Sequence, residues 1–598
     1  MVVKRSSSQY VVMLVGMLLV SIGWGLKEPK TIGVGLRSET LSWTAEASSP
    51  LQAVLRRGAD QARSPRRSPR AIPSLGERTR ERSANQNPEA FWRLKETEGF
   101  SFASGAHVAW GPVRIQAHAA TARVVRIGLN PTRFSATGDV LVEFDTATEQ
   151  RHERITLTAT GPFTLLERAP HRASERDTHL TQGSGSCDGV PIAYGRVGEE
   201  FTFMAVPEGI LITAESFAGV IAASLCVEPA PGALLVVTSL RRRNLNRAGN
   251  PFEPPRYRGV LEIHRSPSVS GEDVPAPFPG GPEASSQGEG PRLRLINVLD
   301  LEAYLQGVIT NEMPASFHPE ALRAQAVAAR TFALAHLGRF AERGFDLDDS
   351  TQSQVYRGVL SEHPNGTAAV QSTSGLVVVR EGLFVPTFYS SSMGGHTESN
   401  EWIFNSPSDQ LPGENAHPAL RAVHDGDFPV PVDLASDEGA LLFYSQAWDH
   451  FDSPGRSGNT RYRWMMTRSA AFIAGRLLSL YGVSLGPITA LVPLLRSPSG
   501  RIARLQIVGE RGAFVLQGWR ALRDFFQLLN SPSAILTRRE ADGTLSFELY
   551  GGGWGHNVGL SQYGAHGRGR SGQTFRDILA AYYTGAEVIA IEEVGSHR

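Results

Sequence analysis

The chain has 598 residues, enough for about three or four domains of ordinary size. The chain has 59 basic residues (Lys and Arg) and 59 acidic residues (Asp and Glu), so its formal net charge is zero. This balance gives no electrostatic reason to expect a nucleic-acid partner, and we expect none. The two cysteines, Cys187 and Cys226, exclude a four-cysteine zinc site and a disulfide-dense scaffold. They form either one disulfide in an exported protein or two buried thiols.

Residues 1–26 have the pattern of a signal peptide or an N-terminal membrane anchor. Lys4 and Arg5 precede an apolar run at residues 10–26, in which Ser21 is the only clearly polar residue. This run is near the lower limit of about 17–25 residues for a spanning helix, so it is either cleaved or retained as an anchor. We therefore expect an exported protein of the cell envelope, periplasmic or wall-associated, that touches the membrane only through this segment.

The next two stretches differ sharply in composition. Residues 27–95 are rich in Arg, Ser, Pro and Ala without an apolar period, which predicts a disordered linker. Residues 96–250 contain short β-rich runs separated by Gly, Pro, Asn and Asp, which predicts a β-rich module whose role the sequence leaves open. The predicted strands of this module are residues 122–129, 139–144, 155–159, 210–214 and 234–238.

Residues 251–598 mix predicted strands and helices, so the predicted fold class is α+β. A strand at residues 257–264 leads to a Pro- and Gly-rich surface loop at residues 266–290. Later predicted strands are residues 292–298, 376–380, 383–388, 503–508, 514–516 and 545–550, and later predicted helices are residues 469–481, 520–529 and 574–583.

The stretch at residues 301–340 predicts two helices that meet near a carboxylate. Asp300 is a good N-cap for the first helix, and Glu312 lies at the C-terminal tip of its apolar face. Pro314 stops that helix, and Pro319 suits the first turn of the second. If its neighbours are mostly apolar, desolvation raises the pKa of Glu312, which suits a general acid. The alternative is a solvated carboxylate at a helix end. Arg330, on the second helix, could fold back towards Glu312.

Four stretches, in order, resemble the motifs of the SpoIID/LytB family, bacterial cell-wall proteins named for a stage II sporulation protein. They are ITNEMPASFHPEALRAQAVAARTFAL at residues 309–334, FDLDDSTQSQVYRG at residues 345–358, FYSSSMGGHTESNE at residues 388–401 and GGGWGHNVGLSQYGA at residues 551–565. The resemblance implies a SpoIID-like domain over residues 251–598 and leaves residues 1–250 unexplained.

Active members of this family are lytic transglycosylases that cut peptidoglycan glycan strands. The resemblance therefore implies cleavage of the bond from N-acetylmuramic acid to N-acetylglucosamine, with a 1,6-anhydro product. Glu312 matches the family's catalytic glutamate and would act as both general acid and general base. Arg330 aligns with a motif arginine that would orient the glutamate or bind a sugar carboxylate.

Two of the motifs supply candidate substrate-binding residues. Small residues would let a glycan approach the backbone, and polar or aromatic groups would contact its sugars. The candidates are Tyr389, Ser392, Gly394, Gly395, His396, His556, Gln562 and Tyr563. Asp349, Thr351, Gln352 and Gln354 are either glycan contacts or structural residues.

Some family members bind zinc through the histidine equivalent to His396 together with nearby cysteines. This chain has no cysteine after Cys226, and a tetrahedral site needs three or four protein ligands. We therefore expect no cofactor and assign His396 to the substrate groove or to the structure.

Three alternatives to the transglycosylase follow from the same residues. In the first, the chain binds glycan without cutting it and recruits or stimulates a cell-wall amidase. In the second, Glu398 or Glu401 serves as a second carboxylate and the enzyme hydrolyses the bond. The third is a metal hydrolase built on His396 and His556.

Overall fold

A computed structural model of the chain describes residues 124–130, 133–134, 141–142, 152–168, 187, 189–221, 224–244, 246–247, 249, 251–266, 291–404, 411–430 and 432–594. The chain divides into two units, Met1–Gly99 and Phe100–Arg598, and every described residue belongs to the second. The predicted signal or anchor, the predicted linker and nearly all of the predicted loop at residues 266–290 lie outside the described residues. Within the described residues, no helix is both long and apolar enough to cross a membrane.

The larger sheet has seven strands in the order β17-β1-β16-β15-β10-β5-β6. Its strands are β1 (Val124–Gly128), β5 (Phe163–Arg168), β6 (Val190–Gly195), β10 (Ser224–Pro229), β15 (Val260–Ser266), β16 (Arg292–Asp300) and β17 (Leu347–Asp348). Neighbouring strands are antiparallel, except that β1 and β17 are parallel. Strands from both sides of residue 250 thus share hydrogen bonds in one sheet. The predicted division between residues 96–250 and 251–598 therefore does not separate two units in the described structure.

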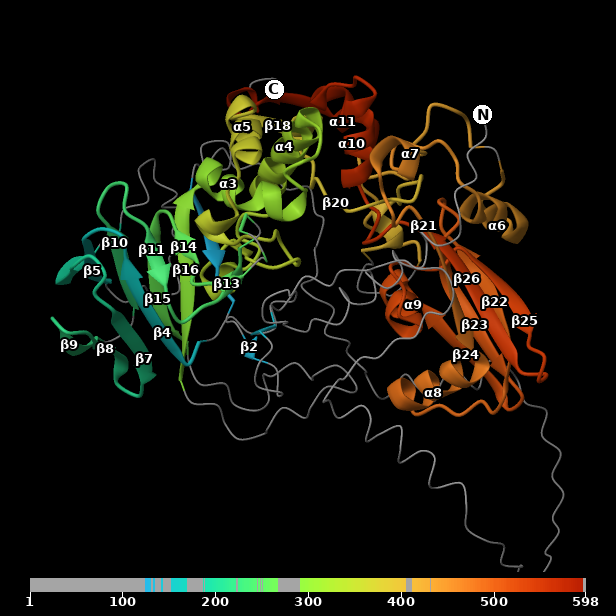
Figure 1. Ribbon diagram of the computed structural model, residues 1–598, viewed down its shortest axis with the longest axis horizontal. Helices are drawn as coiled ribbons and strands as arrows, with labels where there is room; N and C mark the ends of the chain where they lie inside the picture. Colours follow the sequence, from blue (N-terminus) through green and yellow to red (C-terminus); the bar gives the residue numbers. More distant parts are fainter. Residues whose placement is uncertain are drawn as a thin grey trace, which may run out of the picture. The chain divides into compact units, whose positions relative to one another are not determined.

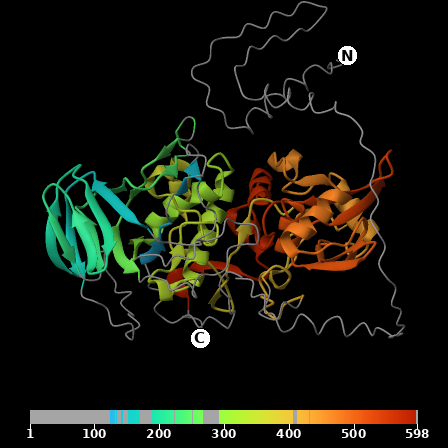
Figure 2. The ribbon, with the colours of Figure 1, turned by 90° about the horizontal axis from the view of Figure 1, so that it is seen from below.

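The second sheet is antiparallel, with six strands in the order β14-β11-β4-β7-β8-β9. Its strands are β4 (Arg154–Ala159), β7 (Phe201–Val206), β8 (Gly209–Thr213), β9 (Ala218–Ile221), β11 (Leu235–Val237) and β14 (Arg256–Tyr257). Phe163 of the first sheet meets Phe201 of the second edge to face, with ring centroids 5.2 Å apart. Figure 2 shows the strands of both sheets near one another in the blue-to-green part of the chain.

The predicted strand at residues 257–264 is two strands in two different sheets. The backbone turns at Gly259, where φ is 70°, so β14 ends at Tyr257 and β15 begins at Val260. A Cβ at Gly259 would lie 2.2 Å from the Val298 carbonyl oxygen, so only glycine fits this turn.

Cys187 and Cys226 are joined by a disulfide, which decides between the two alternatives left open by the sequence. Their Cα atoms lie 6.2 Å apart, within the ordinary range for a bridge. Cys226 is fully buried in β10, so the bridge fastens the segment around Cys187 to the seven-stranded sheet.

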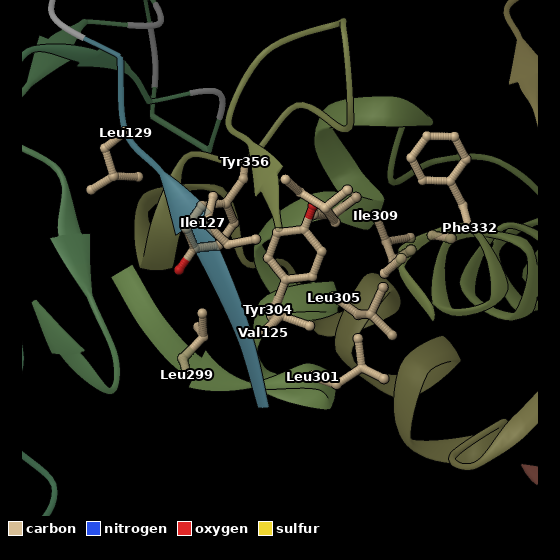
Figure 3. Close-up of a cluster of buried hydrophobic side chains, with 14 of the residues drawn as sticks. Val125, Ile127, Leu129, Leu299, Leu301, Tyr304, Leu305, Ile309, Phe332 and Tyr356 are labelled. Atoms are coloured by element: carbon tan, nitrogen blue, oxygen red, sulfur yellow. The ribbon is translucent and has the colours of Figure 1, made fainter. Parts of the chain in front are cut away.

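A group of helices carries the predicted site, namely α3 (Leu301–Glu312), α4 (Pro319–Ala335), α5 (Pro364–Ser372), α10 (Gln562–Arg570) and α11 (Phe575–Tyr582). Among them, α3 packs against the seven-stranded sheet, α4 against α3, and the others around α4 (Figure 1). Figure 3 shows the shared core, in which Tyr304 of α3 lies near Val125 and Ile127 of β1. Tyr304 is fully buried and its ring centroid lies 5.1 Å from that of Tyr356. This packing fixes α3, and therefore its last residue, against the sheet.

Two small sheets complete this part of the fold. The predicted hairpin forms, with Glu381 and Gly382 at φ values of 53° and 72° in the two-residue turn between β18 and β19. The strands of the two sheets are β18 (Leu376–Arg380), β19 (Leu383–Phe384) and β28 (Glu587–Ala590), and β20 (Tyr389–Ser390) and β27 (Leu560–Ser561).

Between β20 and β27 the chain forms an insertion with a hydrophobic core of its own. Its elements are α6 (Asp437–Ser445), α7 (Pro454–Ser457), β21 (Arg463–Ser469), α8 (Ala470–Tyr481), β22 (Ile488–Arg496), β23 (Ile502–Gly509), β24 (Gly512–Gln517), α9 (Trp519–Phe526), β25 (Ala534–Arg539) and β26 (Leu545–Gly552). The strands form two three-stranded sheets, β21-β26-β25 and β22-β23-β24. The predicted helices at residues 469–481 and 520–529 correspond to α8 and α9.

The remaining short elements are β2 (Arg133–Phe134), β3 (Leu141–Val142), β12 (Arg242–Arg243), β13 (Phe252–Glu253), and 3-10 turns at Ala341–Arg343, Gly358–Ser361, Asn400–Trp402 and Ile591–Glu593. With both helices and sheets throughout the described residues, the predicted α+β class is confirmed.

Candidate functional site

Glu312 is the last residue of α3, as predicted. The Asp300 carboxylate begins the helix by accepting the backbone N–H groups of Glu302 and Ala303. At Met313 the backbone turns extended, and Pro314 follows. The second helix begins at Pro319, so the Glu312 side chain leaves the chain at the junction of α3 and α4.

The Glu312 carboxyl group is half-buried and held by one backbone hydrogen bond. The Val355 N–H donates to Glu312 Oε1 at 2.7 Å. Burial raises the pKa of Glu312 from 4.5 to about 7, although this hydrogen bond and the charge of Arg357 both lower it. Near neutral pH the carboxyl group is therefore present in both protonated and ionised forms, as a group that gives up and takes back a proton requires.

A chain of polar side chains lies beside Glu312. The Tyr304 hydroxyl donates to Gln354 Oε1 at 3.2 Å, and Gln354 Nε2 donates to the Tyr389 hydroxyl at 3.0 Å. Burial, and then the nearby Glu312 carboxylate, raise the pKa of both tyrosines well above the ordinary value. Both phenols therefore stay protonated, and Tyr389, which is half-buried, keeps a hydroxyl close to Glu312.

Arg330 does not occupy its predicted position. Its guanidinium is fully buried and donates to both Glu302 carboxylate oxygens, at 2.6 and 2.7 Å. It also donates to the carbonyl oxygens of Leu376 and Val370. The Arg330 side chain points from α4 towards the start of α3. Its guanidinium is therefore bound to Glu302 and, contrary to the prediction, does not orient Glu312.

The segment 388–401 pairs directly with the C-terminal motif. β20 and β27 run parallel, with Tyr389 opposite Leu560 and Ser390 opposite Ser561. Next along the chain, the Tyr563 N–H donates to the Ser391 carbonyl at 3.0 Å. Two motifs about 170 residues apart in the sequence are thus brought to one place next to the end of α3.

Four predicted glycan contacts in this segment are buried, namely Ser392, Gly394, Gly395 and His396. Gly394 and Gly395 have φ values of 61° and 81°. A Cβ at Gly394 would lie 2.5 Å from the Gly552 carbonyl carbon, and one at Gly395 would lie 2.3 Å from His450 Nδ1. The two glycines therefore allow close packing within the protein, not the predicted approach of a glycan.

His396 lies in a group of three histidines, in which His396 and His450 are buried and His424 is half-buried. His396 Nδ1 lies 2.9 Å from the Thr397 carbonyl oxygen, and burial lowers the pKa of His396 to about 4. Its ring lies 6.1 Å from that of His424, whose Nε2 is 2.8 Å from Nε2 of His450. In the part of the chain that the structure describes, no group of three or more His, Cys, Asp or Glu side chains is arranged to hold a metal ion.

The C-terminal motif contributes the remaining predicted residues. His556 is half-buried, packs against Phe388 and accepts the Val558 N–H at 3.0 Å, and burial lowers its pKa to about 4. Tyr563 is half-buried and meets Phe317, in the link between α3 and α4, edge to face at 5.0 Å.

Gln562 is buried, and its Nε2 lies 3.4 Å from Gln325 Oε1 on α4. Of the predicted substrate-binding residues, the structure thus places Tyr389, His556 and Tyr563 partly at the surface.

Some residues of the motif at residues 345–358 stabilise the fold, and others belong to the site. Asp349 is buried and accepts hydrogen bonds from Asn130 and from Arg242, whose Nη2 lies 2.7 Å from Asp349 Oδ2. Gln354 belongs to the polar chain beside Glu312. Tyr304, Val355 and Arg357 also belong to the site, although the sequence did not predict them there. Tyr304 lies on the buried, apolar face of α3, where the sequence pattern indicates packing alone, and a backbone N–H such as that of Val355 leaves no residue-type signal.

The two candidate second carboxylates are engaged elsewhere. The Glu398 side chain is fully buried and accepts hydroxyl hydrogen bonds from Ser497 and Ser499. Glu401 is buried and forms an ion pair with Arg421. Each carboxylate is therefore part of a structural network in the described protein.

Comparisons with known proteins support the resemblance, and the matching family model covers the first two of the four motifs. Residues 289–379 match the family model described as stage II sporulation protein, and residues 413–559, in the insertion, match a domain of unknown function. Stage II sporulation protein D of Bacillus subtilis (strain 168) is 28% identical over 307 residues, which are 48% of this chain and 74% of that protein.

Two further relatives extend the comparison. An uncharacterized protein of Brachyspira hyodysenteriae is 27% identical over 304 residues, 50% of this chain and 69% of that protein. The amidase enhancer of Bacillus subtilis (strain 168) is 28% identical over 301 residues, 47% of this chain but 39% of that protein. The predicted resemblance to the SpoIID/LytB family is confirmed, because residues 289–379 match the stage II sporulation protein model and about half of the chain is similar to stage II sporulation protein D and to an amidase enhancer.

Proposed function

We propose that this chain is a cell-wall protein that cleaves peptidoglycan glycan strands as a lytic transglycosylase, with Glu312 as the acid and base. The observation that carries the proposal is the half-buried Glu312 carboxyl group, whose pKa of about 7 suits both roles at neutral pH. The similarity to stage II sporulation protein D and to an amidase enhancer supports a role at the cell wall.

In the proposed reaction, protonated Glu312 gives its proton to the oxygen that leaves with N-acetylglucosamine. The bond from that oxygen to the anomeric carbon of N-acetylmuramic acid breaks through an oxocarbenium-like transition state. The C6 hydroxyl of the same muramic sugar attacks the anomeric carbon and loses its proton to the Glu312 carboxylate. The product is a 1,6-anhydro end, no water is consumed, and Glu312 is returned to its protonated form.

The groups around Glu312 support this cycle. The Val355 N–H stabilises the carboxylate left after the first transfer and holds Oε1 in place. The Tyr389 hydroxyl, positioned by Gln354, offers a neutral hydrogen-bonding group to a sugar next to the scissile bond. Glu398 and Glu401 are committed to Ser497, Ser499 and Arg421, and this favours a one-carboxylate mechanism over hydrolysis.

The setting in which we propose that the protein acts is the cell envelope. A disulfide such as Cys187–Cys226 persists in oxidising compartments outside the cytosol, which supports export. The balanced charge of the chain supports no nucleic-acid partner, so its proposed partners are glycan strands and, in the alternative below, an amidase.

The test is a digest of peptide-free glycan strands, read by mass spectrometry. Wild-type protein is expected to release 1,6-anhydro ends, and Glu312→Gln is expected to release none. Hydrated reducing ends would instead indicate hydrolysis. No product from any glycan preparation, with or without stem peptides, would refute the proposed activity.

The similarity to an amidase enhancer favours a second candidate, a non-catalytic protein that binds glycan and recruits or stimulates a cell-wall amidase. This function needs the surface around Glu312 but not its proton. Under it, Glu312→Gln would bind glycan and stimulate a purified amidase as well as the wild type does. Loss of stimulation together with loss of cleavage would count against it.

A further inference from the structure

Trp554 presents an indole ring at the surface next to the segment that carries Tyr389. Its side chain is 42% exposed, and it is the only exposed tryptophan among the described residues. An exposed indole offers apolar area on which the ring of a ligand can stack, and covering that area contributes favourable free energy to binding.

The loop that carries Trp554 is fixed from both sides. Gly553 and Gly555 have φ values of 82° and 110°. A Cβ at Gly553 would lie 2.4 Å from the Ser392 carbonyl oxygen, and one at Gly555 would lie 2.7 Å from Ser390 Cβ. The Trp464 indole N–H also donates to the Gly553 carbonyl at 3.0 Å. The indole of Trp554 is therefore held on a rigid backbone and loses little freedom on binding a ligand.

Arg461 completes a pair with this indole. Its guanidinium carbon lies 4.0 Å from the centroid of the Trp554 ring, in a cation–π contact, and the arginine is itself exposed. Both residues are anchored to Ser392. The backbone N–H of Trp554 donates to the Ser392 carbonyl oxygen at 2.9 Å. The backbone N–H of Arg461 donates to Asn459 Oδ1, and Asn459 Nδ2 donates to the Ser392 hydroxyl oxygen at 2.7 Å.

This placement relates the pair to the proposed active site. Ser392 follows Tyr389 by three residues, and Tyr389 is the residue of this segment that lies near Glu312. An exposed indole with a guanidinium over one face matches a sugar ring that bears a carboxylate, since the remaining apolar area can contact a pyranose ring and arginine pairs with carboxylates. In peptidoglycan that sugar is the muramic acid, which carries a carboxylate on its lactyl ether or on the attached stem peptide.

We propose that Trp554 and Arg461 form a binding subsite for a muramic acid unit of the glycan strand, with the indole stacked on the sugar and the guanidinium paired with its carboxylate. The inference rests on the proposed function, because it places the same strand across Glu312 and Trp554. It adds a carboxylate-reading contact outside the proton-transfer site.

The test is calorimetric binding to full-length Glu312→Gln protein, which would leave the glycan uncut. The ligands are peptide-free glycan strands, peptide-bearing strands and a chitooligosaccharide without carboxylates. Trp554→Ala is expected to weaken binding of all three by about tenfold, the loss typical of a truncated aromatic anchor. Arg461→Ala is expected to weaken only ligands with carboxylates. A loss with peptide-free strands identifies the lactyl carboxylate, and a loss confined to peptide-bearing strands identifies the stem peptide.

Two substitutions far from this pair in the insertion serve as matched controls. Leu478→Ala removes an exposed apolar side chain on α8, and Arg511→Ala removes an exposed charge at the turn between β23 and β24. Both are expected to bind all three ligands as the parent does. In case Trp554→Ala folds poorly, hydroxyl-radical footprinting of the parent protein gives an independent readout, in which bound glycan is expected to protect Trp554 from oxidation.

Unchanged affinity of Trp554→Ala, or an equal loss for all three ligands in Arg461→Ala, would overturn the subsite as stated, as would unprotected Trp554 in the footprint. If the wild type does not cut glycan but Trp554→Ala and Arg461→Ala still weaken binding as expected, the proposed transglycosylase activity is refuted and the subsite is supported. Failure of the parent to bind any glycan would remove both.

Discussion

Replacing Glu312 by glutamine is expected to stabilise the folded protein at alkaline pH. A carboxyl group whose pKa is higher in the folded than in the unfolded state binds its proton more tightly on folding. Its contribution to stability is fully present below its unfolded pKa of 4.5 and is lost as the pH rises through the folded pKa of about 7. Glutamine cannot ionise, and its amide oxygen can still accept the Val355 N–H, so the variant avoids that loss.

The magnitude follows from the shift of the Glu312 pKa from 4.5 to about 7. By linkage this shift corresponds to about 3 kcal/mol of lost stability near pH 8 and to a few tenths near pH 4. Glu312 is partly exposed, and solvent screening reduces the expected gain for Glu312→Gln to about 1.5–3 kcal/mol near pH 8.

The assay is urea denaturation of wild type and variant across this pH range, with Glu320→Gln as the control. Glu320 lies in the first turn of α4, where its carboxylate pairs with Arg323 and accepts the Phe575 N–H. Its substitution is not expected to reproduce the pH-dependent gain. Equal stability of wild type and Glu312→Gln at alkaline pH would refute the raised pKa and, with it, the reason for assigning Glu312 both proton transfers.

Three further substitutions, the first with a control, test a support of the site, a residue of the site and the disulfide. Arg242→Ala leaves Asp349 buried without its cation and is expected to lower the free energy of unfolding by about 3–5 kcal/mol, whereas Arg247→Ala, in a largely exposed pair, should cost at most about 1 kcal/mol. Equal costs in urea denaturation would contradict the supporting role of Asp349. Tyr389→Phe is expected to lower kcat by about tenfold while the protein melts like the wild type, and unchanged kinetics on glycan strands would exclude its hydroxyl from the reaction. Cys226→Ser removes the disulfide and is expected to lower the free energy of unfolding by about 2–4 kcal/mol in the same denaturation assay. If the variant were as stable as the wild type, the bridge would not stabilise the sheet.

The parts of the fold that local chemistry determines could be predicted from the sequence. The Asp300 cap, the helix start at Pro319 and the turn at Glu381-Gly382 each depend on residues adjacent in the chain. The position of Glu312 at the end of α3 followed from the same local rules. Its polar surroundings did not, because Gln354 and Tyr389 reach it only through tertiary packing.

The wrong expectations concern long-range partners. Arg330 aligns with a motif arginine and was expected near Glu312. Its buried guanidinium needs a carboxylate partner, however, and Glu302 on the facing helix is that partner. Gly394 and Gly395 signalled close approach correctly, yet the approaching atoms belong to Gly552 and His450, which lie far along the chain. Hydrogen bonding between strands from both sides of residue 250 likewise leaves no trace in local composition.

The central claim is that the Glu312 carboxyl group performs both proton transfers in cutting a glycan strand. The most direct measurement is the mass spectrum of peptide-free glycan strands after incubation with wild type and with Glu312→Gln at neutral pH. We predict 1,6-anhydro muramic ends from the wild type and none from the variant. Anhydro ends released equally by both proteins would contradict the claim, because the reaction would then proceed without the proton of Glu312.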